Sequence, residues 1–240
     1  MLTHQSFLIE RRKNQNRVEV VNMKALIIAG GDFFPEVAMK TLEDGSFDRI
    51  MAIDNGLSYL HDIRVTPTHI VGDFDTVSND LLKEYQKDPK VKIVSLCPEK
   101  DATDTEVAVD LAVEEGCREI YILGATGGRF DHTLANLYML YKLLCQGIQA
   151  YLIDKNNKIY LIKNSMTLIA KDVKATYVSL LPFTQEVTEL TLHGFKYPLT
   201  RFHLTKGTSI GISNEIVEAI AEIQFEQGIL IVVESKDSVK

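Results

Sequence analysis

Tryptophan is absent from this 240-residue chain, cysteine occurs three times, and no long apolar run is present. No segment approaches the ~20 consecutive apolar residues that span a bilayer, so we expect no membrane partner. The cysteines are odd in number and lack C-x-x-C spacing, which favours reduced thiols and a cytoplasmic protein. Acidic residues outnumber basic ones by 33 to 26, giving a net charge of −7, whereas a nucleic-acid surface requires a basic face.

The first two thirds of the chain alternate between strand and helix patterns. Apolar residues make up 45% of the sequence, enough to bury one large core or two small ones. Strands are expected near 24–29, 49–53, 68–71, 91–95, 119–123 and 149–153, and helices near 35–43, 56–61, 78–87, 103–115 and 132–146. This alternation predicts an α/β domain with a mainly parallel sheet over residues 23–154, preceded by a flexible N-terminal extension over 1–22.

The pattern changes after a predicted turn at 154–157 to short apolar and alternating runs. Strands are expected near 159–162, 176–181, 187–192, 208–212, 217–225 and 229–233. Gln227-Gly228 is placed to turn the last two strands into a hairpin. Residues 155–240 therefore predict a smaller all-β sandwich domain.

An acidic turn follows the buried strand expected at 68–71. Gly72, Asp73 and Asp75 fall at its carboxyl end, and ligands of open α/β sheets bind in the crevice beyond the carboxyl ends of strands. Two carboxylates spaced i and i+2 can face the same side. Few, hard oxygen ligands suit Mg²⁺ bridged to substrate phosphates better than a closed zinc or calcium site.

A second acidic stretch has two interpretations. Thr103 followed by Glu106 is a capping-box pattern, so Asp104 can be explained as a first-turn carboxylate that the helix dipole favours. The presence of another acidic turn in the chain instead favours a metal-ligand role for Asp104. Both interpretations remain open from the residues alone.

A glycine-rich loop lies between the strand expected at 119–123 and the next helix. Gly127 and Gly128 can present backbone N–H groups and a helix N-terminus to phosphate. Arg129 can contact a phosphoryl group in bidentate fashion, or it can form an ion pair with Asp131. His132 is interpreted as an N-terminal helix residue rather than a base. The spacing matches neither the Walker A pattern nor the dinucleotide fingerprint.

These stretches belong to a series of six motifs, and with them the chain resembles the thiamine pyrophosphokinase family from about Lys24 to the C-terminus. The motifs are Asp54-Asn55-Gly56, Gly72-Asp73-Phe74-Asp75, Lys100-Asp101-Ala102-Thr103-Asp104, Gly127-Gly128-Arg129-Phe130-Asp131-His132, Gly194-Phe195-Lys196-Tyr197-Pro198-Leu199 and Ser213-Asn214-Glu215. The acidic turn ends in Thr76 where many relatives have Ser, and Asn55 stands where many have Gly. Without Trp, aromatic stacking on thiamine must come from Tyr or Phe.

The resemblance implies an enzyme that moves the β,γ-pyrophosphoryl group of ATP onto the hydroxyl of thiamine, giving AMP and thiamine diphosphate. It also implies Mg²⁺ and a homodimer with active sites at the subunit interface, the α/β domain binding nucleotide and the sandwich helping to hold thiamine. By motif, Asp73, Asp75 and Asp104 correspond to metal and catalytic carboxylates, Arg129 to a catalytic phosphate contact, and Ser213 and Asn214 to thiamine-binding residues. The nucleotide-binding positions implied are Asp54, Asn55, Gly56, Lys100, Asp101, Gly127, Gly128, Asp131 and His132.

Several alternatives remain at this stage. The general base is unassigned among Asp54, Asp101 and Asp131, each of which can accept a proton from a primary alcohol. A pyrophosphokinase or Mg²⁺-dependent phosphohydrolase for another heterocycle would carry a similar acidic cluster. A non-catalytic sensor of nucleotide or thiamine diphosphate is the alternative outside the enzymes.

Overall fold

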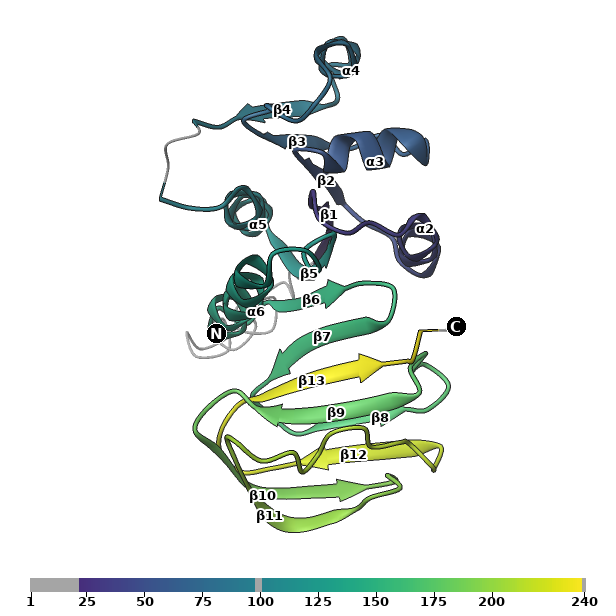
Figure 1. Cartoon of the computed structure of the whole chain (residues 1–240), viewed down its shortest axis with the longest axis vertical. Coiled ribbons are helices and arrows are strands. Elements are labelled where there is room, and N and C mark those ends of the chain that lie inside the picture. Colours follow the sequence, from purple (N-terminus) through teal and green to yellow (C-terminus); the bar gives the residue numbers. More distant parts are fainter. Residues whose placement is uncertain (1–21, 98–100, 239–240) are drawn as a thin grey trace, which may run out of the picture.

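The computed structural model describes residues 22–97 and 101–238 (Figure 1). The predicted extension over 1–22, apart from Asn22, and the predicted contact of Lys100 lie outside this part of the chain. Within it, no helix is long and apolar enough to cross a membrane.

A nine-stranded sheet in the order β4-β3-β2-β1-β5-β6-β7-β13-β9 forms the backbone of the molecule. Its first six strands are parallel: β1 (Met23–Ile28), β2 (Arg49–Ile53), β3 (His69–Gly72), β4 (Lys92–Ser95), β5 (Cys117–Leu123) and β6 (Gln149–Ile153). The helices are α2 (Pro35–Asp44), α3 (Gly56–Asp62), α4 (Asn79–Tyr85), α5 (Asp104–Glu114) and α6 (Phe130–Cys145). All eleven elements overlap their predicted ranges.

Both faces of the central parallel strands β1, β2 and β3 are largely buried, which explains why these strands read as continuous apolar runs. In β1, Ala25 and Ile27 join the core under α5 and α6, while Leu26 and Ile28 join the core under α2 and α3. Figure 1 shows these two helix pairs on opposite faces of the sheet. The chain moves outward from β1 to β4 and then returns to place β5 on the other side of β1, so the topological switch point lies between β1 and β5.

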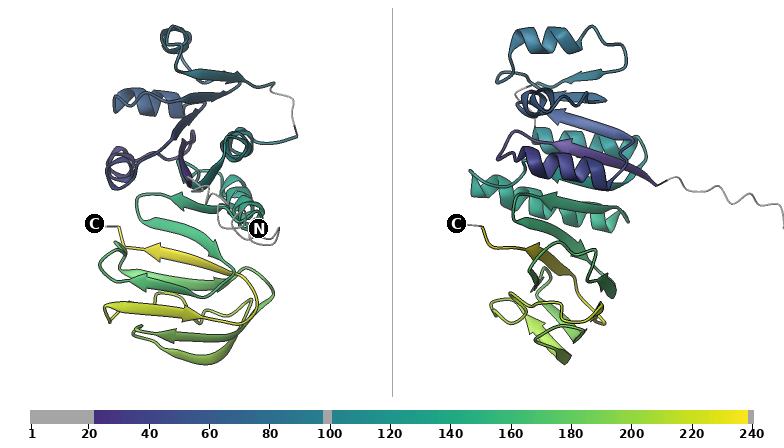
Figure 2. Two further views of the ribbon diagram at one scale, coloured as in Figure 1. Left: turned by 180° about the vertical axis from the view of Figure 1, so that it is seen from behind. Right: turned by 90° about the vertical axis from the view of Figure 1, so that its right-hand side faces the viewer.

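The remaining strands build a sandwich onto the end of this sheet. Strands β7 (Asn157–Ile162), β13 (Leu230–Ser235) and β9 (Tyr177–Pro182) continue it in antiparallel fashion, as Figure 2 shows. The second sheet has the order β11 (Leu199–Thr205), β10 (Glu186–His193), β12 (Ile220–Gln224) and β8 (Met166–Ile169). Buried side chains from the two sheets, including Tyr160, Val232, Leu190 and Ile223, form one core. The predicted fold class is confirmed.

Two predictions within the sandwich are wrong. Residues 208–212 form an irregular loop with turns rather than a strand. Gly211 takes φ +94° and lies close to the Leu180 carbonyl. Its own carbonyl oxygen accepts a hydrogen bond from Leu180 N at 2.8 Å. The predicted hairpin at Gln227-Gly228 instead carries the chain from β12 in one sheet to β13 in the other. Gly228 passes so close to β10 that a Cβ there would lie 2.6 Å from the Glu186 carbonyl oxygen.

Strands β8 and β11 were not predicted. The alternation of side chains along β11 is interrupted at Arg201, which has φ +47°. Its partner strand β10 pairs irregularly near Glu189, which has φ +57°. A bulge of this kind shifts the side chains of a strand out of strict alternation. The four residues of β8 are too few to show a period.

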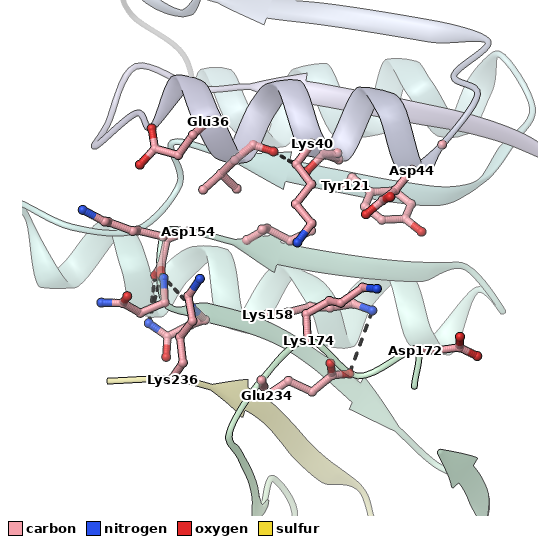
Figure 3. A pocket seen from close by; sticks show the side chains of 18 of the residues that line it. Glu36, Lys40, Asp44, Tyr121, Asp154, Lys158, Asp172, Lys174, Glu234 and Lys236 are labelled. Carbon is pink, nitrogen blue, oxygen red and sulfur yellow. Dashed lines mark hydrogen bonds and ion pairs between the residues drawn. The ribbon is translucent and has the colours of Figure 1, made fainter. Parts of the chain in front are cut away.

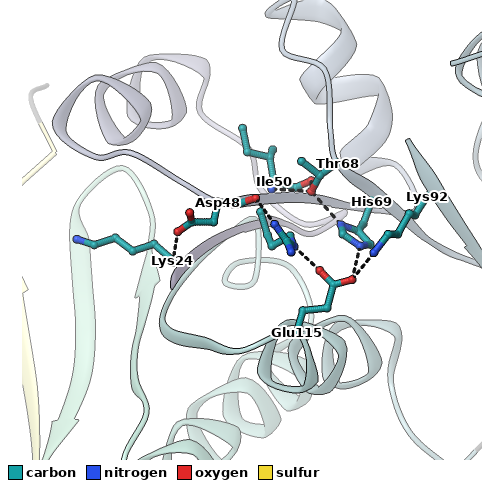
Figure 4. Close-up of polar contacts among 8 residues, drawn as sticks. Lys24, Asp48, Ile50, Thr68, His69, Lys92 and Glu115 are labelled. Atoms are coloured by element: carbon teal, nitrogen blue, oxygen red, sulfur yellow. Dashed lines mark hydrogen bonds and ion pairs between the residues drawn. The ribbon is translucent and has the colours of Figure 1, made fainter. Parts of the chain in front are cut away.

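An ion cluster joins the amino-terminal ends of three strands (Figure 4). Glu115, directly after α5, accepts hydrogen bonds from Arg49 Nε, from Lys92 Nζ at 2.6 Å and from His69 Nε2 at 3.1 Å. Burial alone would raise the pKa of Glu115, but the hydrogen bonds from Lys92 and Arg49 and the contact with His69 lower it to about 2. Burial lowers the pKa of His69, and Glu115 opposes that effect. The cluster therefore ties β2, β3 and β4 to α5 at the edge opposite the strand-end loops.

Candidate active site

The strand-end crevice is the region at the carboxyl edge of the parallel sheet formed by the loops after β1, β2, β3 and β5: residues 29–32, 54–56, 72–76 and 124–129. At the switch point, the loops after β1 and β5 touch through their backbones. Ala29 N lies 2.8 Å from Leu123 O, and Gly31 N lies 2.9 Å from Gly124 O. Gly124 has φ +68°, and a Cβ there would come within 2.4 Å of Ala29 O. The crossing therefore requires glycine at this position.

Asp54, which follows β2, lies against the end of β3. Its N–H donates to Val71 O at 3.2 Å, and a Cβ on Gly72 would come 1.9 Å from Asp54 Oδ1. Asp54 takes φ +46°, whereas Asn55 has an ordinary φ of −60°. The residue that must tolerate an unusual backbone in this motif is thus Asp54, and Asn55 in place of Gly is accommodated without strain.

The acidic turn places its two carboxylates beside one backbone reversal. Asp73 is half-buried, Asp75 is exposed, and Asp75 N donates to Asp73 Oδ1 at 3.2 Å. Phe74 between them has φ +63°. Backbone strain at such a position is common in binding and catalytic sites.

The capping interpretation of the second acidic stretch describes the local structure. Thr103 Oγ1 accepts from Glu106 N at 3.2 Å, so Asp104 is the first residue of α5 and is half-buried. In a full capping box the Glu106 carboxylate would accept from the Thr103 N–H. Here that carboxylate accepts from Lys142 Nζ at 3.0 Å instead. Asp101 is exposed just before the cap.

In the glycine-rich loop, Gly127 and Gly128 are exposed with φ +87° and +55°, and α6 begins at the next residue but one. Arg129 forms the ion pair with Asp131, at 2.6 Å from Nη2 to Oδ2, and both side chains are mostly exposed. The hydrogen bond from Arg129 lowers the pKa of Asp131 to about 2. His132 is an exposed first-turn residue of α6.

Two features that hold this loop were missed from the sequence. Buried Thr126 donates from Oγ1 to Asp154 Oδ2 at 3.1 Å, and buried Asn136 donates from Nδ2 to Ala125 O at 2.8 Å. Asp154 directly follows β6, so its position at a strand end was the available signal. No sequence signal marked Asn136, because an amide side chain within a helix usually faces solvent.

The two sandwich motifs meet one another. Asn214 is 3% exposed; its Nδ2 donates to Tyr197 O at 2.8 Å, and its Oδ1 accepts from Tyr197 N and Glu215 N at 3.0 Å each. Its side chain thereby fastens two motifs together. Ser213 is exposed with φ +54°, and its N–H donates to Ser179 Oγ at 2.9 Å.

The structure thus brings the predicted residues at 54–56, 73–75 and 127–132 to one edge of the sheet, each at the end of its own strand. Over residues 22–97 and 101–238, no three His, Cys, Asp or Glu side chains are grouped as a metal site. Mg²⁺ is commonly held by one or two carboxylates together with substrate phosphates. The donor chemistry of Asp73 and Asp75 fits an ion bound in that way.

Comparison with known proteins identifies the family. The thiamin pyrophosphokinase catalytic domain matches residues 44–152, and the thiamin pyrophosphokinase vitamin B1 binding domain matches residues 165–230. Thiamine pyrophosphokinase of Bacillus subtilis (strain 168) is 37% identical over 214 residues, covering 88% of this chain and 98% of that protein. Thiamine pyrophosphokinase 1 of Oryza sativa subsp. japonica is 26% identical over 177 residues, 70% of this chain and 66% of that protein.

Comparison with solved structures leads to the same family. The crystal structure of the Bacillus subtilis thiamine pyrophosphokinase superposes with a TM-score of 0.80 at 34% identity, covering 90% of this chain and 100% of that one. The thiamin pyrophosphokinase from Geobacillus thermodenitrificans gives a TM-score of 0.78 at 33% identity, covering 90% and 99%. The chain therefore belongs to the thiamin pyrophosphokinase family, with its catalytic domain followed by its vitamin B1 binding domain.

Proposed function

We propose that the chain transfers the β,γ-pyrophosphoryl group of ATP to the hydroxyl of thiamine, using Asp73, Asp75 and Asp104 as Mg²⁺ carboxylates and Arg129 as a phosphate contact. The observation that supports this most directly is the strand-end crevice itself, where an acidic turn and a glycine-rich loop lie at the same edge of a sheet in a chain with both family domains. Catalysis then consists mainly of positioning and charge neutralisation at the β-phosphorus.

The residues of the crevice have different roles in this reaction. When bound, Mg²⁺ supplies stabilisation of the charge that builds on the bridging phosphate oxygen. Gly127 and Gly128 carry no side chains and leave their backbone open to a phosphate before α6, a 16-residue helix whose N-terminus favours an anion. Arg129 is 73% exposed in its side chain, so its ion pair with Asp131 is weak enough to exchange for a phosphoryl group.

The proton acceptor stays open among Asp54, Asp101 and Asp131. The Arg129 hydrogen bond lowers the pKa of Asp131 to about 2, and that effect is lost when Arg129 turns to a phosphoryl group. Asp54 is half-buried at the end of β2, beside the acidic turn, whereas Asp101 is exposed.

We place thiamine between two subunits of a homodimer. Helix α6 exposes an apolar stripe of Phe130, Leu134, Tyr138 and Tyr141, at 70%, 37%, 62% and 42% exposure, starting directly after Arg129. Exposed Ile210 and Ile212 precede Ser213 in the same loop of the sandwich. Pairing the α6 stripe with this loop of a second copy covers both apolar surfaces and carries Ser213 and the Asn214 motif to the crevice. The three cysteines are free, which supports action in the reducing cytoplasm.

The reaction is tested by incubating the purified chain with ATP, Mg²⁺ and thiamine and separating the products. AMP and thiamine diphosphate are expected in equal amounts, and none without Mg²⁺. ADP or free phosphate would instead indicate another phosphotransferase or a hydrolase. ATP binding without turnover would favour the sensor.

The carboxylate roles are tested by Asp73→Asn and Asp104→Asn. Each should lower turnover about 10²-fold or more, because a charged group at the reacting phosphates is lost, while the melting temperature stays nearly unchanged. Asp80→Asn, an exposed first-turn residue of α4, is the matched control. Near-normal turnover of either variant at limiting Mg²⁺ would show that its metal role is wrong.

A further inference from the structure

A cavity of about 440 Å³ lies away from the helices α5 and α6, between α2, the strands β5 and β6, and the sandwich (Figure 3). Its walls come from Lys40 and Val37 of α2, Tyr121 of β5, Lys158 of β7 and Lys174 in the loop before β9. None of the proposed catalytic or binding residues lines it. Its size and its position between two domains are typical of small-molecule sites.

The cavity is rich in lysine although the chain is acidic. Six lysines line it, namely Lys24, Lys40, Lys155, Lys158, Lys174 and Lys236. Lys24 pairs with Glu119 at 2.9 Å and Lys158 pairs with Glu234 at 3.9 Å, whereas Lys40 and Lys174 form no ion pair with any residue in the part of the chain that the structure describes. Figure 3 shows Lys40 extending from α2 toward the strands below it. Unpaired cations that line a shared cavity favour an anionic occupant.

Five carboxylates also line the cavity: Glu36, Asp44, Asp154, Asp172 and Glu234. Two of them are already engaged by the protein. Asp154 Oδ1 accepts from the N–H groups of Asn156 and Asn157 at 2.8 Å each, and Glu234 accepts from the Tyr160 hydroxyl at 3.0 Å. Glu36, Asp44 and Asp172 are exposed, as Lys40 and Lys174 are, and they limit the excess positive charge. The arrangement therefore suits an occupant with a small number of negative charges.

One wall is apolar and aromatic. Phe47 and Tyr121 meet edge to face with ring centroids 5.3 Å apart, and Ile153 and Val37 extend the same surface. Tyr121 is fixed by donating its hydroxyl hydrogen to Glu119 Oε1 at 2.5 Å. A rigid aromatic wall opposite ammonium groups suits a flat ring that carries an anionic substituent.

We propose that this cavity is a second ligand site, separate from the strand-end crevice, for a planar heteroaromatic phosphate monoester. The phosphate lies among Lys40, Lys158 and Lys174, and the ring packs on Phe47 and Tyr121. The site does not depend on the proposed reaction, because its walls contain none of the crevice residues.

Pyridoxine 5′-phosphate is the probe, and its dissociation constant for the full chain is measured by titration calorimetry. Saturable binding is expected, with or without saturating Mg²⁺-ATP. Lys40→Ala combined with Lys174→Ala should raise the constant at least tenfold. Lys87→Ala combined with Lys90→Ala, two exposed lysines beyond α4, should leave it unchanged. Thermal unfolding of both double variants should match the parent, so that lost binding is not lost folding.

The position is checked with pyridoxal 5′-phosphate and borohydride, followed by peptide mapping. Lys40, Lys158 or Lys174 should be modified faster than Lys90, and pyridoxine 5′-phosphate should protect them. Absence of saturable binding, displacement of the probe by Mg²⁺-ATP, or an unchanged constant in the cavity variant overturns the site. Inorganic phosphate binding as tightly as the probe overturns the aromatic part of the proposal.

Discussion

Replacing Glu115 by Gln should destabilise the protein without abolishing its chemistry, because Glu115 lies at the edge of the sheet opposite the strand-end crevice. The fall of its pKa from 4.5 to about 2 corresponds to roughly 3 kcal/mol of favourable interaction. Lys92 is 62% exposed, so water screens its share, and we expect a loss of about 2 kcal/mol in the free energy of unfolding. In a chain of this size that lowers the melting temperature by roughly 4–8 °C.

The assay is urea unfolding at pH 7, followed by turnover at 25 °C. Glu114→Gln is the matched control, because Glu114 is the preceding residue and is exposed. A loss no larger for Glu115→Gln than for Glu114→Gln would refute the reasoning. So would a stable variant that lacks turnover, because it would connect the cluster to catalysis.

The same cluster predicts a pH dependence. The pKa of Glu115 is lowered on folding, so its contribution is complete above pH 4.5 and is lost as pH falls from 4.5 toward 2. The pKa of His69 is also lowered, so the unfolded chain takes up a proton first and stability begins to fall below pH 6.5. Glu115→Gln should remove the loss between pH 4.5 and 2 and keep the one that begins at 6.5.

Three further variants test the backbone crossing, the cap and the proposed dimer. Gly124→Ala should lower the free energy of unfolding by several kcal/mol and raise the KM for ATP, because the added Cβ would lie 2.4 Å from Ala29 O. The control is Gly147→Ala, which is also at positive φ but faces open space. It should lower the free energy of unfolding, measured in urea, by only about 1–2 kcal/mol. Thr103→Ala should cost about 1 kcal/mol through the lost cap, and an unchanged midpoint would contradict it. Tyr138→Glu should yield monomers in equilibrium sedimentation, unlike Ile169→Glu on β8; a Tyr138→Glu dimer would exclude the α6 interface.

The parallel half of the fold was predictable because its signals are local. Continuous apolar runs identify strands buried on both faces, and Thr103 marks the start of α5 through a hydrogen bond that spans three residues. The clustering of strand-end residues followed from the sheet alone. The role of Asp154 did not, because its partner Thr126 is 28 residues away.

The sandwich was harder because its pairing is nonlocal. Gln227-Gly228 has hairpin composition, yet the strands on either side belong to different sheets. Nothing in the sequence of β13 specifies β7 and β9 as its neighbours, which precede it by about 70 and 50 residues. Asn214 had the composition of an ordinary loop residue, and only its 3% exposure reveals that it clamps two motifs.

The insertion of β13 between β7 and β9 has a consequence for biosynthesis. While the chain emerges from the ribosome, the α/β half can fold, but β7 presents an unpaired edge and β9 lacks its neighbour in the sheet until Leu230–Ser235 has left the exit tunnel. Exposed strand edges invite pairing with other nascent chains. A product that stops before β13 therefore exposes the edges of β7 and β9 and is prone to aggregate, and a chaperone that covers those edges would protect it.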